Sequence, residues 1–194
     1  MTQVWMRRGR YRPPAAGAHR PATPRWRAVC WLPLLAVACA PALDWRQLRP
    51  DGWGLALSLP CRPASHARTL PLAGPPVELQ LYACSAEDHT FAAASADLVD
   101  PARVGPALQA LATAAQGNLQ GRVVSERAAT VPGMTPHPAA RRWRIEGRRP
   151  DGQPLHGQVL VFAHGARVFQ VTLLGPRADE ALAKPLFDSV EVRP

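Results

Sequence analysis

Residues 159–174 read VLVFAHGARVFQVTLL, two nearly continuous apolar runs separated by the segment His164–Arg167. Apolar runs of this length, bounded by a turn such as His164-Gly165, are typical of strands that are buried on both faces. We therefore predict strands over residues 155–163 and 167–174 at the centre of a β-sheet.

Shorter stretches in which apolar and polar residues alternate predict further strands, because Gly, Pro and Asp turns separate them. These strands are expected over residues 53–60, 66–72, 77–84, 90–98, 122–131 and 140–147, with a short last strand over 190–192. We expect the first three to form a meander, in which the first and third strands are parallel and end at the same edge of the sheet.

Two helices are expected between these strands. Asp100 and Pro101 provide an N-cap and a favourable first residue for a long helix, and Gly121 is a typical C-terminal stop. Its apolar residues fall on one face; they are Val104, Leu108, Leu111, Ala112, Ala115 and Leu119. Pro106 places the start of regular helix near Gly105. A short helix over residues 178–187 completes an α+β domain on a mostly antiparallel sheet, which we predict for residues 53–194.

The N-terminal part of the chain is typical of an export signal. Residues 28–38 form an uncharged, mainly apolar run of 11 residues behind Arg25 and Arg27. A signal-peptide core has about 7–15 apolar residues, whereas a membrane-spanning helix needs about 20. Small residues precede Cys39, as signal peptidases require, so we expect residues 1–38 to be removed. The long Pro- and Arg-rich stretch 1–24 favours a translation start further downstream.

Residues 36–39, Ala-Val-Ala-Cys, resemble the lipobox of bacterial lipoproteins. The resemblance implies that Cys39 is lipidated and that residues 39–52 form a tether on the periplasmic side of the cell envelope. Ala40, in place of Asp, follows the family's outer-membrane sorting pattern. The membrane is then the first expected partner. Ala36 stands where the family usually has Leu, so an Ala-x-Ala cleavage site followed by a coincidental cysteine remains open.

Removal of the signal changes the charge of the protein. The whole chain has 23 basic and 14 acidic residues, a formal charge of +9, but seven of the arginines lie in residues 1–38. The remaining 16 basic and 14 acidic residues give the mature chain a formal charge of +2. The basic character is therefore mainly a targeting feature and does not indicate nucleic-acid binding.

Two cysteines remain in the mature chain besides Cys39, because Cys30 is lost with the signal. Cys61 and Cys84 are expected to form a disulfide in an oxidising compartment. The predicted meander would place both at the same end of the sheet. Two separate buried thiols are the alternative. Zinc binding is not expected, since no second CxxC or paired-His spacing accompanies them.

Residues 53–60 near the start of the domain and 187–190 near its end resemble the PsbP-like fold. This fold is found in extrinsic photosystem II subunits and in many bacterial secreted or lipid-anchored proteins. The likeness covers residues 53–192. It implies an accessory or binding role, and a fold alone does not name a ligand.

Motifs for catalysis and cofactors are missing from the sequence. It has no G-x-S-x-G elbow, H-E-x-x-H pair, P-loop or G-x-G-x-x-G loop, so no cofactor and no enzyme activity are expected. Glu87, Asp88 and His89 are consecutive residues of a turn and point in different directions. We therefore interpret them as a solvated loop and expect no metal site.

Arginines cluster between residues 141 and 149. If Trp143 and Ile145 face the core, alternate residues of the same strand project from the opposite face, where the next strand contributes a histidine. The resulting candidate site for an anionic ligand consists of Arg142, Arg144, Arg148 and His156. Guanidinium groups on a rigid sheet bind phosphate or carboxylate in bidentate fashion. Lipid headgroups, envelope glycan phosphates or an acidic envelope protein are the candidate ligands. The alternative is a solvated strand face that limits edge aggregation.

These observations predict a lipid-anchored accessory or binding protein of the cell envelope without catalytic activity. The alternative hypothesis is a small envelope hydrolase that uses the hairpin containing His156 and His164. Nucleic-acid binding is disfavoured by export and by the low charge of the mature chain.

Overall fold

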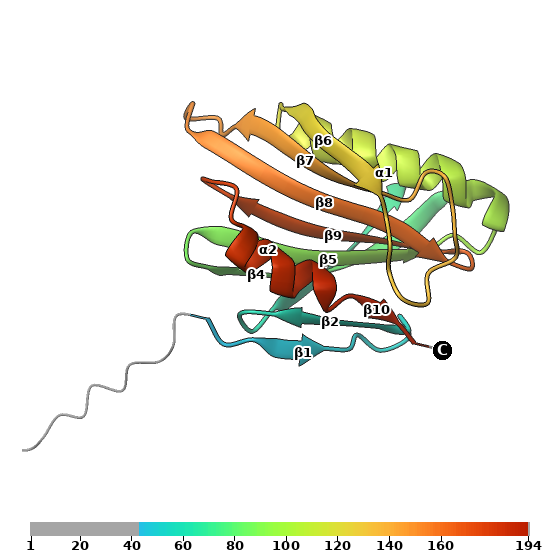
Figure 1. Ribbon diagram of the computed structural model, residues 1–194. Coiled ribbons are helices and arrows are strands. Elements are labelled where there is room, and N and C mark those ends of the chain that lie inside the picture. Colours follow the sequence, from blue (N-terminus) through green and yellow to red (C-terminus); the bar gives the residue numbers. More distant parts are fainter. Residues whose placement is uncertain (1–42, 194) are drawn as a thin grey trace, which may run out of the picture. The chain divides into compact units, whose positions relative to one another are not determined.

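A computed structural model of the chain describes residues 43–193. Its described part is an α+β fold with a seven-stranded antiparallel sheet, a three-stranded antiparallel sheet and two α-helices (Figure 1). The predicted fold class, a mostly antiparallel sheet with one main helix and a short C-terminal helix, is confirmed at this level. The signal segment and Cys39 lie outside the described residues.

The large sheet has the strand order β3-β4-β5-β9-β8-β7-β6. Its strands are β3 (Ala64–Pro71), β4 (Pro76–Ala86), β5 (His89–Asp97), β6 (Arg122–Ala128), β7 (Arg141–Arg148), β8 (Pro154–His164) and β9 (Arg167–Gly175). The two apolar strands β8 and β9 lie inside this sheet, as predicted. Seven consecutive residues of β8, Gly157–Ala163, are buried, which explains the uninterrupted apolar run.

The small sheet has the order β1-β2-β10, from β1 (Arg46–Leu48), β2 (Leu55–Leu59) and β10 (Glu191–Val192). The predicted meander beginning with residues 53–60 is therefore wrong, because β2 pairs with β1 and β10 and does not join β3. An alternating apolar strand must be covered on one face, but its sequence does not say by which neighbours. Strand β2 belongs to the small sheet, which packs against one face of the large sheet.

Residues 43–52 belong to the folded domain, so the predicted tether, residues 39–52, extends too far along the chain. Arg46–Leu48 form strand β1, and Leu43, Trp45 and Leu48 pack against the core. The ring of Trp45 meets Phe91 edge-on, with centroids 6.1 Å apart. Three apolar residues in so short a segment do not form a pattern that predicts a strand. Their burial depends on contacts with distant parts of the chain.

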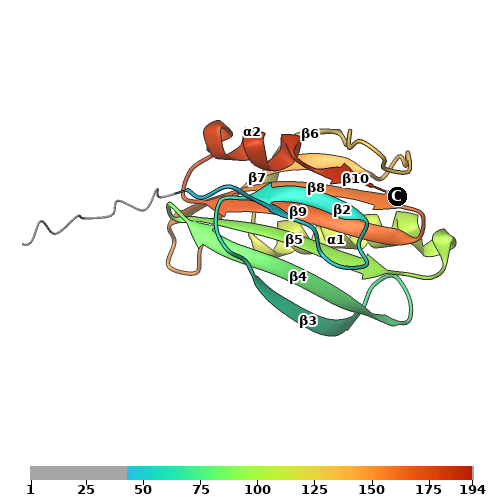
Figure 2. The same ribbon diagram turned by 90° about the horizontal axis from the view of Figure 1, so that it is seen from below.

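The large sheet is the middle layer of the molecule. Helix α1 (Val104–Asn118) lies on one face, and the small sheet lies with α2 (Glu180–Asp188) on the other (Figures 1 and 2). Trp53 packs from the small-sheet side on Phe169, with ring centroids 6.3 Å apart, and Phe169 stacks on Phe162 of the neighbouring strand. Buried aromatic rings therefore fill the space between the two sheets.

Helix α1 begins close to the predicted position. Asp100 caps a single 3-10 turn, Pro101–Arg103, by accepting a hydrogen bond of 2.9 Å from the amide of Ala102. Pro106 lies in the first turn of α1, where backbone N–H groups have no helical partner, so a proline is tolerated there. At the other end, Gln120 and not Gly121 adopts the left-handed conformation, with φ of 46°.

Helix α2 is held at both ends. Asp179 accepts hydrogen bonds from the amides of Ala181 and Leu182, at 3.0 and 3.2 Å. After the helix, Ser189 accepts a hydrogen bond of 2.8 Å from the amide of Ser58 in β2. The C-terminal helix is thereby fixed against the small sheet and over one face of β7 and β8. No helix within residues 43–193 is long and apolar enough to cross a membrane.

Candidate functional site

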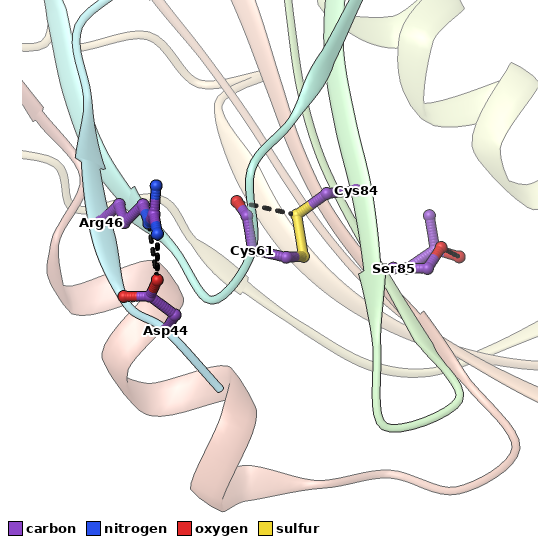
Figure 3. Close-up of a disulfide and its surroundings, with 6 residues drawn as sticks. Asp44, Arg46, Cys61, Cys84 and Ser85 are labelled. Carbon is purple, nitrogen blue, oxygen red and sulfur yellow. Dashed lines mark hydrogen bonds and ion pairs between the residues drawn. A yellow bond between two sulfur atoms is a disulfide. The ribbon is translucent and has the colours of Figure 1, made fainter. Parts of the chain in front are cut away.

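The predicted disulfide between Cys61 and Cys84 is present (Figure 3), with 5.9 Å between the two Cα atoms. Its setting differs from the expected one. Cys61 follows β2 of the small sheet and Cys84 lies in β4 of the large sheet, so the bond connects the two sheets and does not close one edge of a meander. Ser85, the next residue of β4, points to the opposite side of the strand (Figure 3).

Arg142, the first residue of the predicted anion site, lies beneath helix α2. Its guanidinium carbon is 3.7 Å from the ring centroid of Phe187, and its Nη2 donates a hydrogen bond of 2.6 Å to Gln158. Burial, followed by the positive charge of Arg127, lowers the pKa of Arg142 to about 10. Arg142 is still a cation at neutral pH, but its planar face is already occupied by an aromatic ring.

Arg144 is also engaged by α2. It forms an ion pair with Glu180 in the first turn of the helix, and the same carboxylate oxygen accepts a hydrogen bond of 2.9 Å from Gln158. The buried side chain of Gln158 accepts from Arg142 and donates to Glu180, so it connects Arg142 to the carboxylate that also pairs with Arg144. The network joins residues of β7 and β8 to the first turn of α2, and we interpret it as the attachment of α2 to the sheet.

Arg148 lies apart from this network, whereas His156 lies beside it and lines a cavity of about 100 Å³ together with Arg144 and Gln158. The guanidinium of Arg148 donates to the carbonyl oxygen of Gly152 in its own turn, at 3.1 Å. Together with Arg122, both residues line an open depression of about 540 Å³ near the end of the sheet. Arg122 is paired there with Glu146 at 2.7 Å. Of the four residues of the predicted site, Arg142 and Arg144 therefore contact α2, Arg148 faces a shallow polar surface, and His156 borders both.

The alternative hypothesis of an envelope hydrolase uses the hairpin that contains His156 and His164, and the structure places these two histidines far apart. They lie near opposite ends of β8, about 26 Å apart at a strand's usual rise per residue. His164 is exposed at the predicted turn, and its Nδ1 is 2.8 Å from the carbonyl oxygen of Gly133. The two histidines are therefore too far apart to act in one site, and the hydrolase hypothesis stays a prediction.

The turn at Glu87 and Asp88 is present where the sequence predicts it. Both residues have positive φ values and are exposed. His89, by contrast, is only 1% exposed and packs against Gly175, where an added Cβ would lie 2.0 Å from the imidazole ring. The interpretation of all three residues as a solvated loop was therefore wrong for His89. Within residues 43–193 no group of three His, Cys, Asp or Glu side chains is placed to hold a metal ion.

A mainly apolar surface depression lies elsewhere, between α1 and the edge strands of the large sheet. We call this feature the α1–β3 groove; its volume is about 520 Å³. One row of the sheet crosses its floor, formed by register partners of four strands: His66, Leu81, Ala94 and Gln170. The volume is within the range of about 300–1,000 Å³ that is usual for small-molecule sites.

The groove exists because α1 covers only part of the sheet. The helix packs across β8 and β9, so the same face of β3 and β4 projects beyond it. Leu79 and Leu81 of β4 form the floor there, and the small side chains of Ala110 and Ala114 form the helical wall. Alternation in residues 77–84 predicted one buried face for this strand, but it did not show that the helix leaves part of that face uncovered.

The ionisable side chains that line the groove are all basic. His66 and Arg68 lie at its outer side on β3, whose residues are almost all exposed. Among the residues that line the groove in the described part of the chain there is no Asp or Glu. Within residues 43–193, neither His66 nor Arg68 makes a side-chain hydrogen bond or ion pair. These two basic groups therefore differ from Arg142 and Arg144, which are paired within the protein.

No protein-family model matches the chain, and no curated protein sequence matches it. Among solved structures, it is similar to PA94 from Pseudomonas aeruginosa, a protein of unknown function, with 15% identity and a TM-score of 0.37. The match covers 73% of this chain and 89% of that chain. Neither a fold family nor a function follows from a likeness at this level.

Proposed function

We propose that this chain is an exported, lipid-anchored binding protein of the cell envelope that acts without catalysis and uses the α1–β3 groove as its binding site. The observation that carries the proposal is the Cys61–Cys84 disulfide between the two sheets. Disulfides persist in oxidising compartments and are rare in the cytosol. A structural disulfide therefore supports the export that the signal-like segment 25–39 predicts.

The anchor proposed at Cys39 would hold the domain close to the membrane. Asp44 is already part of the fold, because its amide donates a hydrogen bond of 2.8 Å to the carbonyl oxygen of Pro60. A fully extended chain from Cys39 to Asp44 spans at most about 17 Å. The domain would thus sit against the membrane on its Asp44 side, and Ala40 favours the outer membrane as its location.

The binding role is supported by the kind of surface that the groove provides. It combines a mainly apolar floor that includes Gln170, a wall of small side chains, and two basic groups without partners in the described chain. Ligand sites are typically concave and mainly apolar, with a few polar groups that set orientation. The predicted anion site on β7 is a weaker candidate, because α2 already occupies Arg142 and Arg144.

The PsbP-like resemblance is consistent with this role, and we retain it as part of the proposal. The two segments on which it was based, residues 53–60 and 187–190, lie next to each other: Ser58 is hydrogen-bonded to Ser189 at 2.8 Å. The resemblance to accessory and binding proteins supports a non-catalytic function.

Metabolic labelling with palmitate tests the anchor directly. The wild-type chain should incorporate label and fractionate with the envelope, whereas Cys39→Ser should lose the label. Cys30→Ser is the matched control and should be labelled like the wild type, because Cys30 would be removed with the signal. Equal labelling of Cys39→Ser and wild type would refute the anchor, and cleavage without any label would favour the Ala-x-Ala alternative.

A further inference from the structure

The α1–β3 groove is chemically asymmetric. Its interior side is formed by the helical wall and by Leu79 and Leu81, while its outer side carries Arg68 and His66 on the edge strand. In the register of the sheet, Arg68 is the partner of Leu79 and His66 is the partner of Leu81. Each basic side chain is therefore adjacent to a floor leucine, at the open margin of the apolar surface.

We propose that the α1–β3 groove binds the hydrocarbon chain of a long-chain fatty carboxylate, with the carboxylate at Arg68 and His66. This inference rests on the binding function proposed above and names its ligand class. Apolar contact with the leucines and alanines holds the chain, and the guanidinium group of Arg68 donates hydrogen bonds to the carboxylate. His66 supplies a further ring N–H donor at the same margin.

The size of the groove favours a single chain. A methylene group is about as large as a water molecule, which occupies about 30 Å³ in the liquid. The volume of about 520 Å³ therefore accommodates one chain of roughly 12 to 16 carbons, but not both chains of a phospholipid. No acid lines the groove in the described part of the chain, so a carboxylate meets no like charge at the margin.

Binding is measured with the chain from residue 40 onward, which forms one compact unit with its own core. Decanoate, dodecanoate and tetradecanoate are titrated below their micellar concentrations, together with dodecanol as the uncharged ligand of equal length. Each added methylene should strengthen binding about fourfold while the chain stays inside the groove. Dodecanoate should bind more tightly than dodecanol, because only dodecanoate pairs with Arg68.

Two pairs of variants separate the chain site from the carboxylate site. Ala114→Phe fills the groove from the exposed part of its wall and should abolish binding, whereas Gln116→Phe, on the same helix but outside the groove, should not. Arg68→Gln should weaken dodecanoate about fivefold, as expected for an exposed ion pair, and leave dodecanol unchanged. Arg49→Gln, at an exposed position outside the groove, is its control.

The outcomes distinguish this inference from the function on which it rests. If dodecanol binds as tightly as dodecanoate and Arg68→Gln has no effect, the carboxylate assignment is overturned while the groove remains a binding site. If no ligand binds, or if Ala114→Phe binds like the wild type, the groove is not the site and the binding function proposed for it fails as well. Palmitate labelling at Cys39 is unaffected by either result.

Discussion

Removal of the inter-sheet disulfide should destabilise the domain by an amount that the structure allows us to estimate. The bond joins residues 23 positions apart. Closing a loop of this length lowers the entropy of the unfolded chain and stabilises the native state by about 3 kcal/mol. We therefore expect the variant Cys61→Ala/Cys84→Ala to unfold with a free energy about 3 kcal/mol below that of the oxidised wild type. Alanine is suitable because both half-cystines are only partly buried.

Equilibrium unfolding in urea, followed by tryptophan fluorescence, measures this difference. With a slope of about 2 kcal/mol per molar, the midpoint should fall by roughly 1.5 M. Reduction of the wild type should lower its midpoint to that of the double variant, and reductant should not affect the double variant. If the oxidised wild type and the double variant unfold within about 0.5 kcal/mol of each other, the argument from loop closure is refuted.

Three further predictions concern packing and charge. Gly147→Ala should destabilise the domain by about 1–3 kcal/mol in urea unfolding, because its Cβ would lie 2.1 Å from the carbonyl oxygen at the C-cap of α1. Gly117 lies inside α1 with open space around the position of an added Cβ. Gly117→Ala should therefore stabilise the domain by about 0.5–1 kcal/mol. Arg142→Met should destabilise the domain by about 1–3 kcal/mol in thermal unfolding, because it leaves the side-chain oxygen of the buried Gln158 without its donor. A neutral or stabilising effect would contradict this. The hydrogen bond from Lys184 holds the pKa of Asp188 below its ordinary value of 3.8. The ionised Asp188 therefore stabilises the folded protein fully above about pH 4, and this stabilisation is lost as the pH falls through the lowered pKa. Lys184→Met should raise that pKa in an NMR titration, and an unchanged value would contradict the assignment.

The candidate site could be predicted from the sequence only in part. Alternation in β7 correctly places Arg142 and Arg144 on the face opposite Ile145, since neighbouring residues of a strand point to opposite faces. It does not show that α2 covers this face, because Phe187 and Glu180 lie 45 and 36 residues further along the chain. The sequence therefore suggests a free binding surface at Arg142 and Arg144, whereas in the structure both side chains contact residues of α2.

The α1–β3 groove is a candidate site that the sequence did not predict. The sequence predicts the helix, the strands and the apolar face of each, but the groove depends on how far α1 reaches across the sheet. That reach is set by the packing of α1 on β8 and β9. Arg68 and His66 gave no signal in the sequence, since isolated basic residues on a weakly patterned strand are typical of a solvated edge.

The sequence by itself determined the α+β class, the central strands, the capped start of the main helix and the two cysteines available for a disulfide. These features depend on residues close together in the chain, whose spacing records burial and backbone preference directly. Only the tertiary structure decided that β2 pairs with β10 across about 135 residues, that the disulfide connects two sheets, and that the groove remains open. An apolar face must be covered to leave water, and which distant segment covers it is settled by the packing of the whole chain.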